Sequence, residues 1–311
     1  MNRAWRIVRP VNLGIVALTF VFIRLFLFQP VTKNGSPSLY LQNWEYSLLA
    51  ISVILITAAG YIINDIRDVE ADRINKPDRQ FVGSSVSESL AWRYYFILTI
   101  AGLISGLFIS LRVGRLPLFG VHVMAVLLLY LYAGFLKRVA LAGNLTVSVL
   151  IAISVLTPAV FEPAFYEVEN LSEYQTAAYV WKWVAGLAVF SFLLTLPREL
   201  VKDLEDLEGD RLAGFRTFPA LAGEQATRVL VICWLVVVSA LTVYTSRYLW
   251  LFYDDRSFLV IGGVMMFGLC WMMLVLSKPV TLQLNHLVSL VSKLMLLPGL
   301  LSLWVQYLII K

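Results

Sequence analysis

Two clusters of aspartate, each following a long apolar run, are the residues of this chain best suited to chemistry. Both have the spacing Asp-x-x-Asp-x-x-x-Asp, and their members are Asp65, Asp68, Asp72, Asp203, Asp206 and Asp210. Carboxylates are costly beside lipid, so such clusters at the edge of a membrane indicate a functional site. The repeated spacing predicts one site built from two halves of the chain.

The chemistry predicted for these clusters is metal binding. On a helix, residues i, i+3 and i+7 share one face, so each cluster could project three carboxylates together. Like charges on one face repel unless a cation neutralises them. Oxygen ligands without His or Cys suit Mg²⁺, which combines one or two carboxylates with substrate phosphate oxygens. We therefore expect two Mg²⁺ ions that neutralise a diphosphate leaving group. The predicted metal ligands are Asn64, Asp65, Asp68, Asp72, Asp203, Asp206 and Asp210, with Asp68, Asp72, Asp203 and Asp210 as the catalytic residues.

Basic residues surround both clusters. Arginine offers bidentate contacts to phosphate, and lysine offers a point charge. Metal ligands and phosphate-binding cations together indicate a lipid diphosphate as substrate. The alternative, that each cation only sets membrane topology, stays open. The residues predicted to bind diphosphate or acceptor are Arg9, Arg73, Lys76, Arg79, Lys137, Arg138, Lys202 and Arg211.

The composition indicates the elements that must hold such a site. Hydrophobic residues make up 59% of the 311 residues and charged residues only 14%, whereas soluble domains average about 25% charged residues. A spanning helix needs roughly 20 mostly apolar residues. The sequence thus predicts an all-α polytopic membrane bundle of about nine helices. The predicted spans are 11–28, 45–63, 89–111, 116–135, 144–161, 177–196, 227–244, 258–276 and 286–310.

Charge alternates between the predicted loops. The set that includes both aspartate clusters holds sixteen of the 25 Lys and Arg residues. The positive-inside rule then places the N-terminus and both clusters in the cytoplasm and the C-terminus outside, in a protein of the cell (inner) membrane. The net charge of +5 fits cytoplasmic loops beside acidic lipid headgroups rather than a nucleic-acid partner.

The motifs resemble those of a known family. Asn64-Asp65-x-x-Asp68-x-x-x-Asp72, continuing to Arg79, is similar to the first signature of the UbiA-type intramembrane prenyltransferases, and 198–210 is similar to the second. The segment from Tyr132 to Lys137-Arg138 and Asn144 resembles the family's middle segment. Arg9-Pro10-x-Asn12 resembles its entrance. The resemblance covers almost the whole chain, 1–311, as a single transmembrane domain.

The resemblance implies a helical bundle with a central cavity capped by two cytoplasmic loops. It also implies Mg²⁺-dependent transfer of an isoprenoid chain from a polyprenyl diphosphate, through an allylic cation that an acceptor captures. The apolar bundle would keep water from that cation. Asn12, Tyr132 and Arg198 join the substrate-binding residues on this ground.

The acceptor is the least determined part of the prediction. The second motif is most similar to that of the digeranylgeranylglyceryl phosphate synthases, in which a glycerol hydroxyl attacks, so geranylgeranylglyceryl phosphate is the expected acceptor. An aromatic acceptor of quinone biosynthesis, 4-hydroxybenzoate or homogentisate, is the alternative. A cation-coupled transporter is the alternative of another class, but transporters usually hold ions near the midplane on broken helices. The clusters here lie at helix ends, which favours the enzyme.

Overall fold

This computed structural model describes residues 7–32, 37–70, 81–278 and 282–310. In these residues the regular structure is helical, and extended pairing is limited to isolated bridges between Val82 and Val86 and between Val139 and Arg216. Nine spans in the same residues are long and apolar enough to cross a membrane. The protein is therefore an all-α integral membrane protein, as the sequence predicts.

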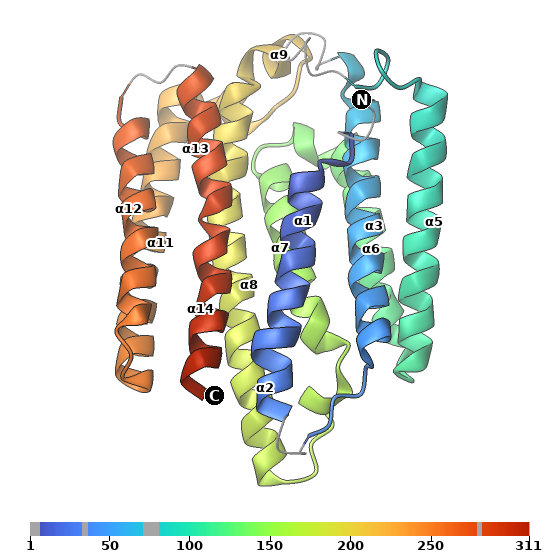
Figure 1. Ribbon diagram of the computed structural model, residues 1–311. Helices are drawn as coiled ribbons and strands as arrows, with labels where there is room; N and C mark the ends of the chain where they lie inside the picture. Colours follow the sequence, from blue (N-terminus) through green and yellow to red (C-terminus); the bar gives the residue numbers. More distant parts are fainter. Residues whose placement is uncertain (1–6, 33–36, 71–80, 279–281, 311) are drawn as a thin grey trace. The chain divides into compact units, whose positions relative to one another are not determined.

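The helices follow the predicted order (Figure 1). Those before residue 140 are α1 (Pro10–Phe22), a π-helical segment (Ile23–Phe28), α2 (Gln29–Thr32), α3 (Asn43–Arg67), α5 (Glu88–Arg112), α6 (Phe119–Gly134) and 3₁₀ turns at Leu116–Leu118 and Leu136–Arg138. Those after it are α7 (Ala142–Val160), a 3₁₀ turn at Pro163–Phe165, α8 (Leu171–Glu205), α9 (Leu207–Leu212), α10 (Phe218–Ala222), α11 (Glu224–Tyr253), α12 (Ser257–Leu276), α13 (Leu282–Leu294) and α14 (Leu296–Ile310).

Two helices extend well beyond their predicted bounds. Helix α8 continues to Glu205 instead of ending at 196, and α11 continues to Tyr253 instead of 244. Hydropathy detects the part of a helix that lipid covers, whereas backbone hydrogen bonding continues into polar sequence. The last span is broken between α13 and α14, because Pro298 lacks an N–H and its ring crowds the carbonyl four residues earlier.

Contacts divide the chain into two compact units, which we describe separately. Unit 1 contains Met1–Lys137 and Ile153–Val184, and unit 2 contains Arg138–Ala152 and Ala185–Lys311. Helices α7 and α8 each contribute residues to both units. A single domain over 1–311 stays a prediction.

Glycines set the packing of α3, α5 and α6 in unit 1. A Cβ on Gly102 would lie 2.8 Å from Ile56, and one on Gly106 would lie 2.6 Å from the ring of His122. That ring sits 2.9 Å from the hydroxyl of Ser52. Small residues let membrane helices approach closely, where dispersion and interhelical hydrogen bonds hold them. The rigid helix α3 that carries the first aspartate motif is seated in this way.

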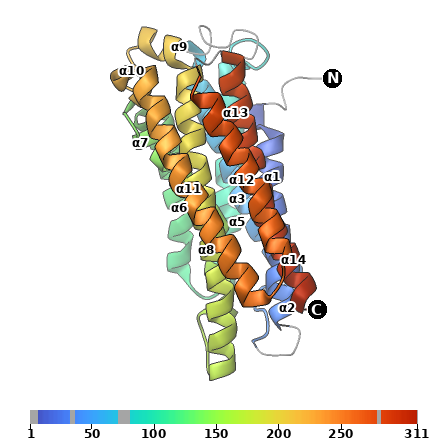
Figure 2. The same cartoon turned by 90° about the vertical axis from the view of Figure 1, so that its left-hand side faces the viewer.

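In unit 2 the core lies among α8, α11, α12 and α13. Leu200, Val238, Leu269 and Val288 are among its buried members. Figures 1 and 2 both show α11 and α12 side by side along their length. This apolar cluster supports the end of α8, where the second aspartate motif begins.

A buried polar cluster lies at the end of unit 1 away from the first motif. The guanidinium of Arg24, within the π-helical segment, donates to the carbonyl of Leu41 at 2.6 Å and lies 3.5 Å from Glu162. The Glu162 carboxylate accepts the N–H groups of Tyr40 at 2.6 Å and Leu41 at 3.3 Å. Burial raises the pKa of the Glu162 carboxyl above its usual value. The cluster ties the segment before α3 to the end of α7.

Candidate active site

The first aspartate motif surrounds the end of α3. Asp65 lies in its last turn, and Asp68 follows the final residue with φ −99° and ψ 3°. The Asp68 N–H donates to the Asn64 carbonyl at 3.0 Å, which closes the helix. This conformation belongs to a sparsely populated region in which active-site residues are often found. The predicted site residues Asp72, Arg73, Lys76 and Arg79 lie outside the described residues.

The start of α1 reaches this motif. Arg9 donates from Nη2 to Asp65 Oδ1 at 2.9 Å, and its guanidinium lies over the Tyr61 ring, 4.7 Å from the centroid. Asn12 donates from Nδ2 to the Tyr61 hydroxyl at 3.0 Å. The structure thus brings the predicted binding residues Arg9 and Asn12 to the first motif. Tyr61, which the sequence did not single out, connects them one helical turn before Asp65.

Asp68 is held from two directions. Asn64 donates from Nδ2 to Asp68 Oδ2 at 2.7 Å. Lys137, in the 3₁₀ turn after α6, donates to Asp68 Oδ1 through a side chain that is only 9% exposed. Tyr132 is half-buried on the last turns of α6. A cation predicted to bind phosphate is therefore in direct contact with a predicted metal ligand.

The second motif repeats this backbone geometry in unit 2. Helix α8 ends at Glu205, and Asp206 stands before α9 with φ −94° and ψ 3°. The expected unbroken helix is thus interrupted at the central aspartate of each motif. The N–H groups of Asp206 and Asp210 still reach the carbonyls four residues earlier, at 3.1 and 3.0 Å. Asp210 is buried and Asp203 half-buried.

Asp203 is oriented by an amide. Asn144, buried at the start of α7, donates from Nδ2 to Asp203 Oδ2 at 2.7 Å. The resemblance already marked Asn144 as part of the middle segment, and the structure adds its partner. Because this donor is neutral, the contact orients the carboxylate without placing a positive charge beside it.

Glu199 is a polar residue to which the sequence motifs gave no separate role. It is buried, receives Nη1 of Arg198, and lies 3.7 Å from Nζ of Lys202. Its position four residues before Asp203 puts it one helical turn away on the same face. That spacing was the available signal. Two predicted substrate-binding cations are therefore gathered beside the second motif by a carboxylate that is not one of its three aspartates.

The remaining basic residues of unit 2 differ in environment. The guanidinium of Arg138 lies over the ring of Phe215, 4.8 Å from its centroid, and the Arg138 carbonyl accepts the N–H of Arg216 at 2.9 Å. Arg211 is exposed on α9. Lys137 and Arg138 are neighbours in sequence, yet the first belongs to unit 1 and the second to unit 2.

The ligand atoms that the two motifs offer are of the type that a hard cation prefers. They are carboxylate and amide oxygens, and Asn64 Oδ1 is buried without a hydrogen-bond partner in the described part of the chain. Such a buried acceptor is costly unless something binds it. Among the described residues, no three His, Cys, Asp or Glu side chains form a group that could hold an ion.

Fold and motifs together define a polytopic membrane protein that carries acidic and basic side chains at the ends of its helices. The model of the UbiA prenyltransferase family matches residues 17–284. The chain belongs to this family and is a prenyltransferase.

Known relatives agree with this assignment. The digeranylgeranylglyceryl phosphate synthase of Methanoculleus marisnigri is 35% identical over 225 residues, which cover 72% of this chain and 70% of that relative. A solved structure from work on digeranylgeranylglyceryl phosphate synthase in membranes has a TM-score of 0.65 at 24% identity and covers 98% of this chain and 97% of its own. A UbiA homologue from Archaeoglobus fulgidus, solved with GPP and Mg²⁺, has a TM-score of 0.57 at 16% identity, with 96% and 98% covered. These structures share the fold.

Proposed function

We propose that this protein transfers a geranylgeranyl group from geranylgeranyl diphosphate to the free hydroxyl of geranylgeranylglyceryl phosphate. The bond between the allylic carbon and the diphosphate oxygen breaks, and an ether bond to the glycerol oxygen forms. Diphosphate leaves, and the hydroxyl proton is lost. The names of the similar synthases support this acceptor.

The observation that carries the proposal is the pairing of motif carboxylates with cations from distant parts of the chain. Asp65 is paired with Arg9, and Asp68 with Lys137. A phosphate group bound beside these carboxylates would therefore contact Arg9 and Lys137. An acceptor that is itself a phosphate ester needs cations beyond those that serve the diphosphate, and Arg9, Lys137 and Arg138 are suited to that second phosphate.

The aspartate motifs are proposed to hold two Mg²⁺ ions in one site. The ligands would be Asn64, Asp65, Asp68 and Asp72 from the first motif, and Asp203, Asp206 and Asp210 from the second. Bound Mg²⁺ neutralises the charge that develops on the diphosphate as it leaves. Arg198, Lys202 and Arg211 would bind the same leaving group, and Asn12 and Tyr132 would contribute to substrate binding.

The same reasoning extends to location. We propose that the chain forms one domain in the cell (inner) membrane with its N-terminus and both motifs on the cytoplasmic side. The excess of Lys and Arg in the loops that carry the motifs supports this orientation.

The test is a product analysis with purified protein in lipid nanodiscs. Geranylgeranyl diphosphate is supplied with geranylgeranylglyceryl phosphate, 4-hydroxybenzoate or homogentisate, and products are identified by mass spectrometry. We expect the diether product only, at a rate that falls to background in excess EDTA and returns with Mg²⁺. Efficient prenylation of an aromatic acid instead would replace the acceptor, and full turnover in EDTA would remove the metal.

A further inference from the structure

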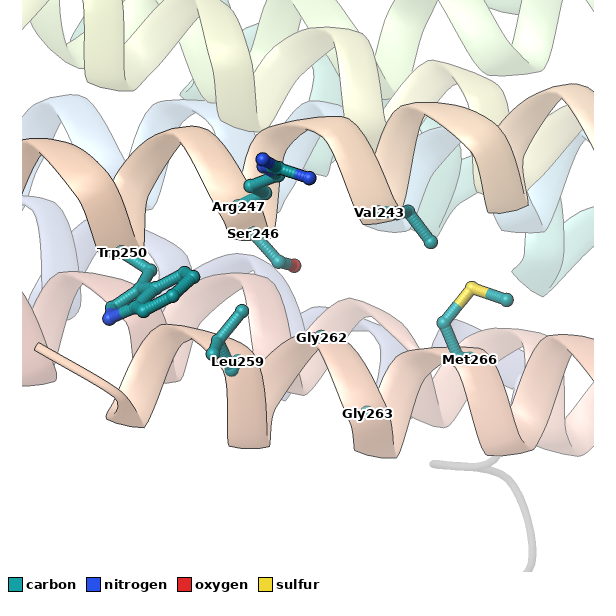
Figure 3. A pocket seen from close by; sticks show the side chains of 8 residues that line it. All are labelled: Val243, Ser246, Arg247, Trp250, Leu259, Gly262, Gly263 and Met266. Atoms are coloured by element: carbon teal, nitrogen blue, oxygen red, sulfur yellow. The ribbon is translucent and has the colours of Figure 1, made fainter.

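A groove between α11 and α12 lies in unit 2, away from the second aspartate motif (Figure 3). Its volume is about 270 Å³. Side chains of Val243 and Trp250 reach into it from α11, and those of Leu259 and Met266 reach into it from α12. Helix α11 begins just after the second motif, and the groove lies along the last third of α11 and the first half of α12, so it is toward the end of these helices opposite that motif.

Two adjacent glycines of α12 create the groove. A Cβ on Gly262 would lie 2.1 Å from the hydroxyl of Ser246, so the helices touch at this point. A Cβ on Gly263 would meet no atom within 4 Å, so this side of the contact is open. The helices are thus held close at Gly262, while the space beside Gly263 stays open. A groove of this volume suits a segment of one lipid chain, because pockets for whole small molecules usually exceed about 300 Å³.

A positive charge stands at the rim. Arg247 lines the groove from α11, and in the described part of the chain its exposed guanidinium has no hydrogen bond or ion pair with protein groups. It lies six residues before the end of α11, about 9 Å along the axis. A long side chain at this depth reaches the headgroup region of the bilayer.

In the described part of the chain, the charged residues of the turn at this end form no ion pair with Arg247. The turn between α11 and α12 contains Asp254, Asp255 and Arg256. Asp255 is occupied locally, because its Oδ1 accepts the N–H of Ser257 at 2.7 Å. Trp250 adds an amphipathic ring of the kind that sits at membrane interfaces.

We propose that this groove binds one anionic phospholipid from the membrane leaflet opposite the aspartate motifs. Its phosphate contacts Arg247, whose planar guanidinium can donate two hydrogen bonds to phosphate oxygens. One of its chains lies along Gly263 and Met266. The charge of Arg247 makes the site selective for anionic over neutral headgroups, and the groove fixes where the lipid lies.

The experiment is native mass spectrometry of the purified full chain with phosphatidylglycerol or phosphatidylcholine of identical chains. Wild-type protein is expected to retain one phosphatidylglycerol in preference to phosphatidylcholine. Arg247→Gln should lower the phosphatidylglycerol-bound fraction at least about fivefold, the effect of losing a charge-assisted contact. Gly263→Leu, which fills the groove, should lower the retention of both lipids. Arg256→Gln, at the same end, and Gly120→Leu, an exposed glycine on α6 with open space around it, should match wild type.

Four results would overturn the lipid site. The first is that Arg247→Gln retains as much phosphatidylglycerol as wild type does. The second is that wild type retains phosphatidylcholine as well as phosphatidylglycerol. The third is an equal loss in Arg256→Gln, because the attraction would then be nonspecific. The fourth is a dimer that Gly263→Leu dissociates, because the groove would then bind a second copy of the chain. Should Gly263→Leu fail to fold, Arg247→Gln decides alone, since the Arg247 side chain supports no other part of the described protein.

Discussion

The two aspartate motifs have the same spacing and the same backbone but different electrostatic surroundings. Asp68 and Asp206 each stand at a helix interruption, with φ −99° and −94° and ψ 3° in both. In unit 1, Arg9 and Lys137 come from other segments to pair with the motif itself. In unit 2, the amide of Asn144 holds the motif carboxylate, and nearby cations gather on Glu199. The two motifs therefore share a backbone geometry and differ in the charge of the groups that contact their carboxylates.

We expect this electrostatic difference to give the two motifs different roles. A carboxylate paired with lysine has its charge compensated before any ligand arrives. A carboxylate held by a neutral amide receives no such compensation from its partner and gains more from a bound cation. We expect the second motif to dominate cation affinity, and the first to couple the cation to the phosphates that Arg9 and Lys137 can contact.

The strongest test is the matched pair Asp68→Asn and Asp203→Asn. Each should reduce turnover about a hundredfold to a thousandfold, because each removes a carboxylate proposed to hold the Mg²⁺ that stabilises the leaving group. Their stabilities should differ. Asp68→Asn removes the carboxylate that the buried Lys137 side chain contacts and should lower the melting temperature in detergent by several degrees. Asp203→Asn keeps a neutral pair with Asn144 and should melt at or above the wild-type temperature.

Both variants are assayed for geranylgeranyl transfer and for thermal unfolding after size-exclusion chromatography. Near-normal turnover in either would refute a site that requires both motifs. Equal losses of stability would show that the electrostatic difference between the units has no energetic weight.

A smaller effect is expected for the adjacent cations Lys137 and Arg138. Lys137→Gln removes a buried contact to Asp68 and should lower kcat/KM about tenfold, as loss of a hydrogen bond to a charged group would. Arg138→Gln removes a charge that lies over Phe215 and should cost less. Both should raise KM for the glyceryl phosphate acceptor more than for the diphosphate, which marks lost ground-state binding.

Steady-state kinetics with each substrate varied in turn shows which KM rises in Lys137→Gln and Arg138→Gln. A rise in KM for the diphosphate alone would assign these cations to the leaving group and would exclude a second phosphate contact at Lys137 and Arg138.

The smallest effects should come from the two amides, Asn144→Ala and Asn12→Ala. Asn144→Ala frees the Asp203 carboxylate and should raise the Mg²⁺ concentration for half-maximal activity several-fold. Asn12→Ala removes only a neutral hydrogen bond to Tyr61, worth about 1 kcal/mol, and should leave that concentration unchanged. Mg²⁺ titrations of activity compare the two, and an equal shift in both would contradict the assignment of cation affinity to the second motif.

The fold was predictable because few backbone structures can cross a lipid bilayer. Backbone polar groups inside a bilayer must be satisfied within the segment, so an apolar run of the right length has to be helical. The break before Pro298 follows from the same local chemistry. The ends of α8 and α11 were not predictable from hydropathy, since Arg198–Glu205 and Arg247–Tyr253 are polar or mixed and yet helical.

For the candidate site, the sequence indicated which residue types would come together and only part of how they are arranged. Spacing indicated that Asp203 and Asp206 belong together, but an unbroken helix was assumed, and the turn at Asp206 depends on backbone angles that spacing does not encode. From the sequence alone, Glu199 looks like any acidic residue at the end of a span, and only its contacts with Arg198 and Lys202 distinguish it. Lys137 and Arg138 share the same local sequence, and only their contacts separate them.

The buried pair of Arg24 and Glu162 has a consequence for how the chain enters the membrane. Its members are 138 residues apart, so the first span leaves the ribosome long before the acid that compensates its charge. Until the end of α7 emerges, the Arg24 guanidinium has to be hydrated or held by headgroups, because an isolated charge in hydrocarbon is costly. We therefore expect the first helix to reach its final depth only after the end of α7 has been synthesised.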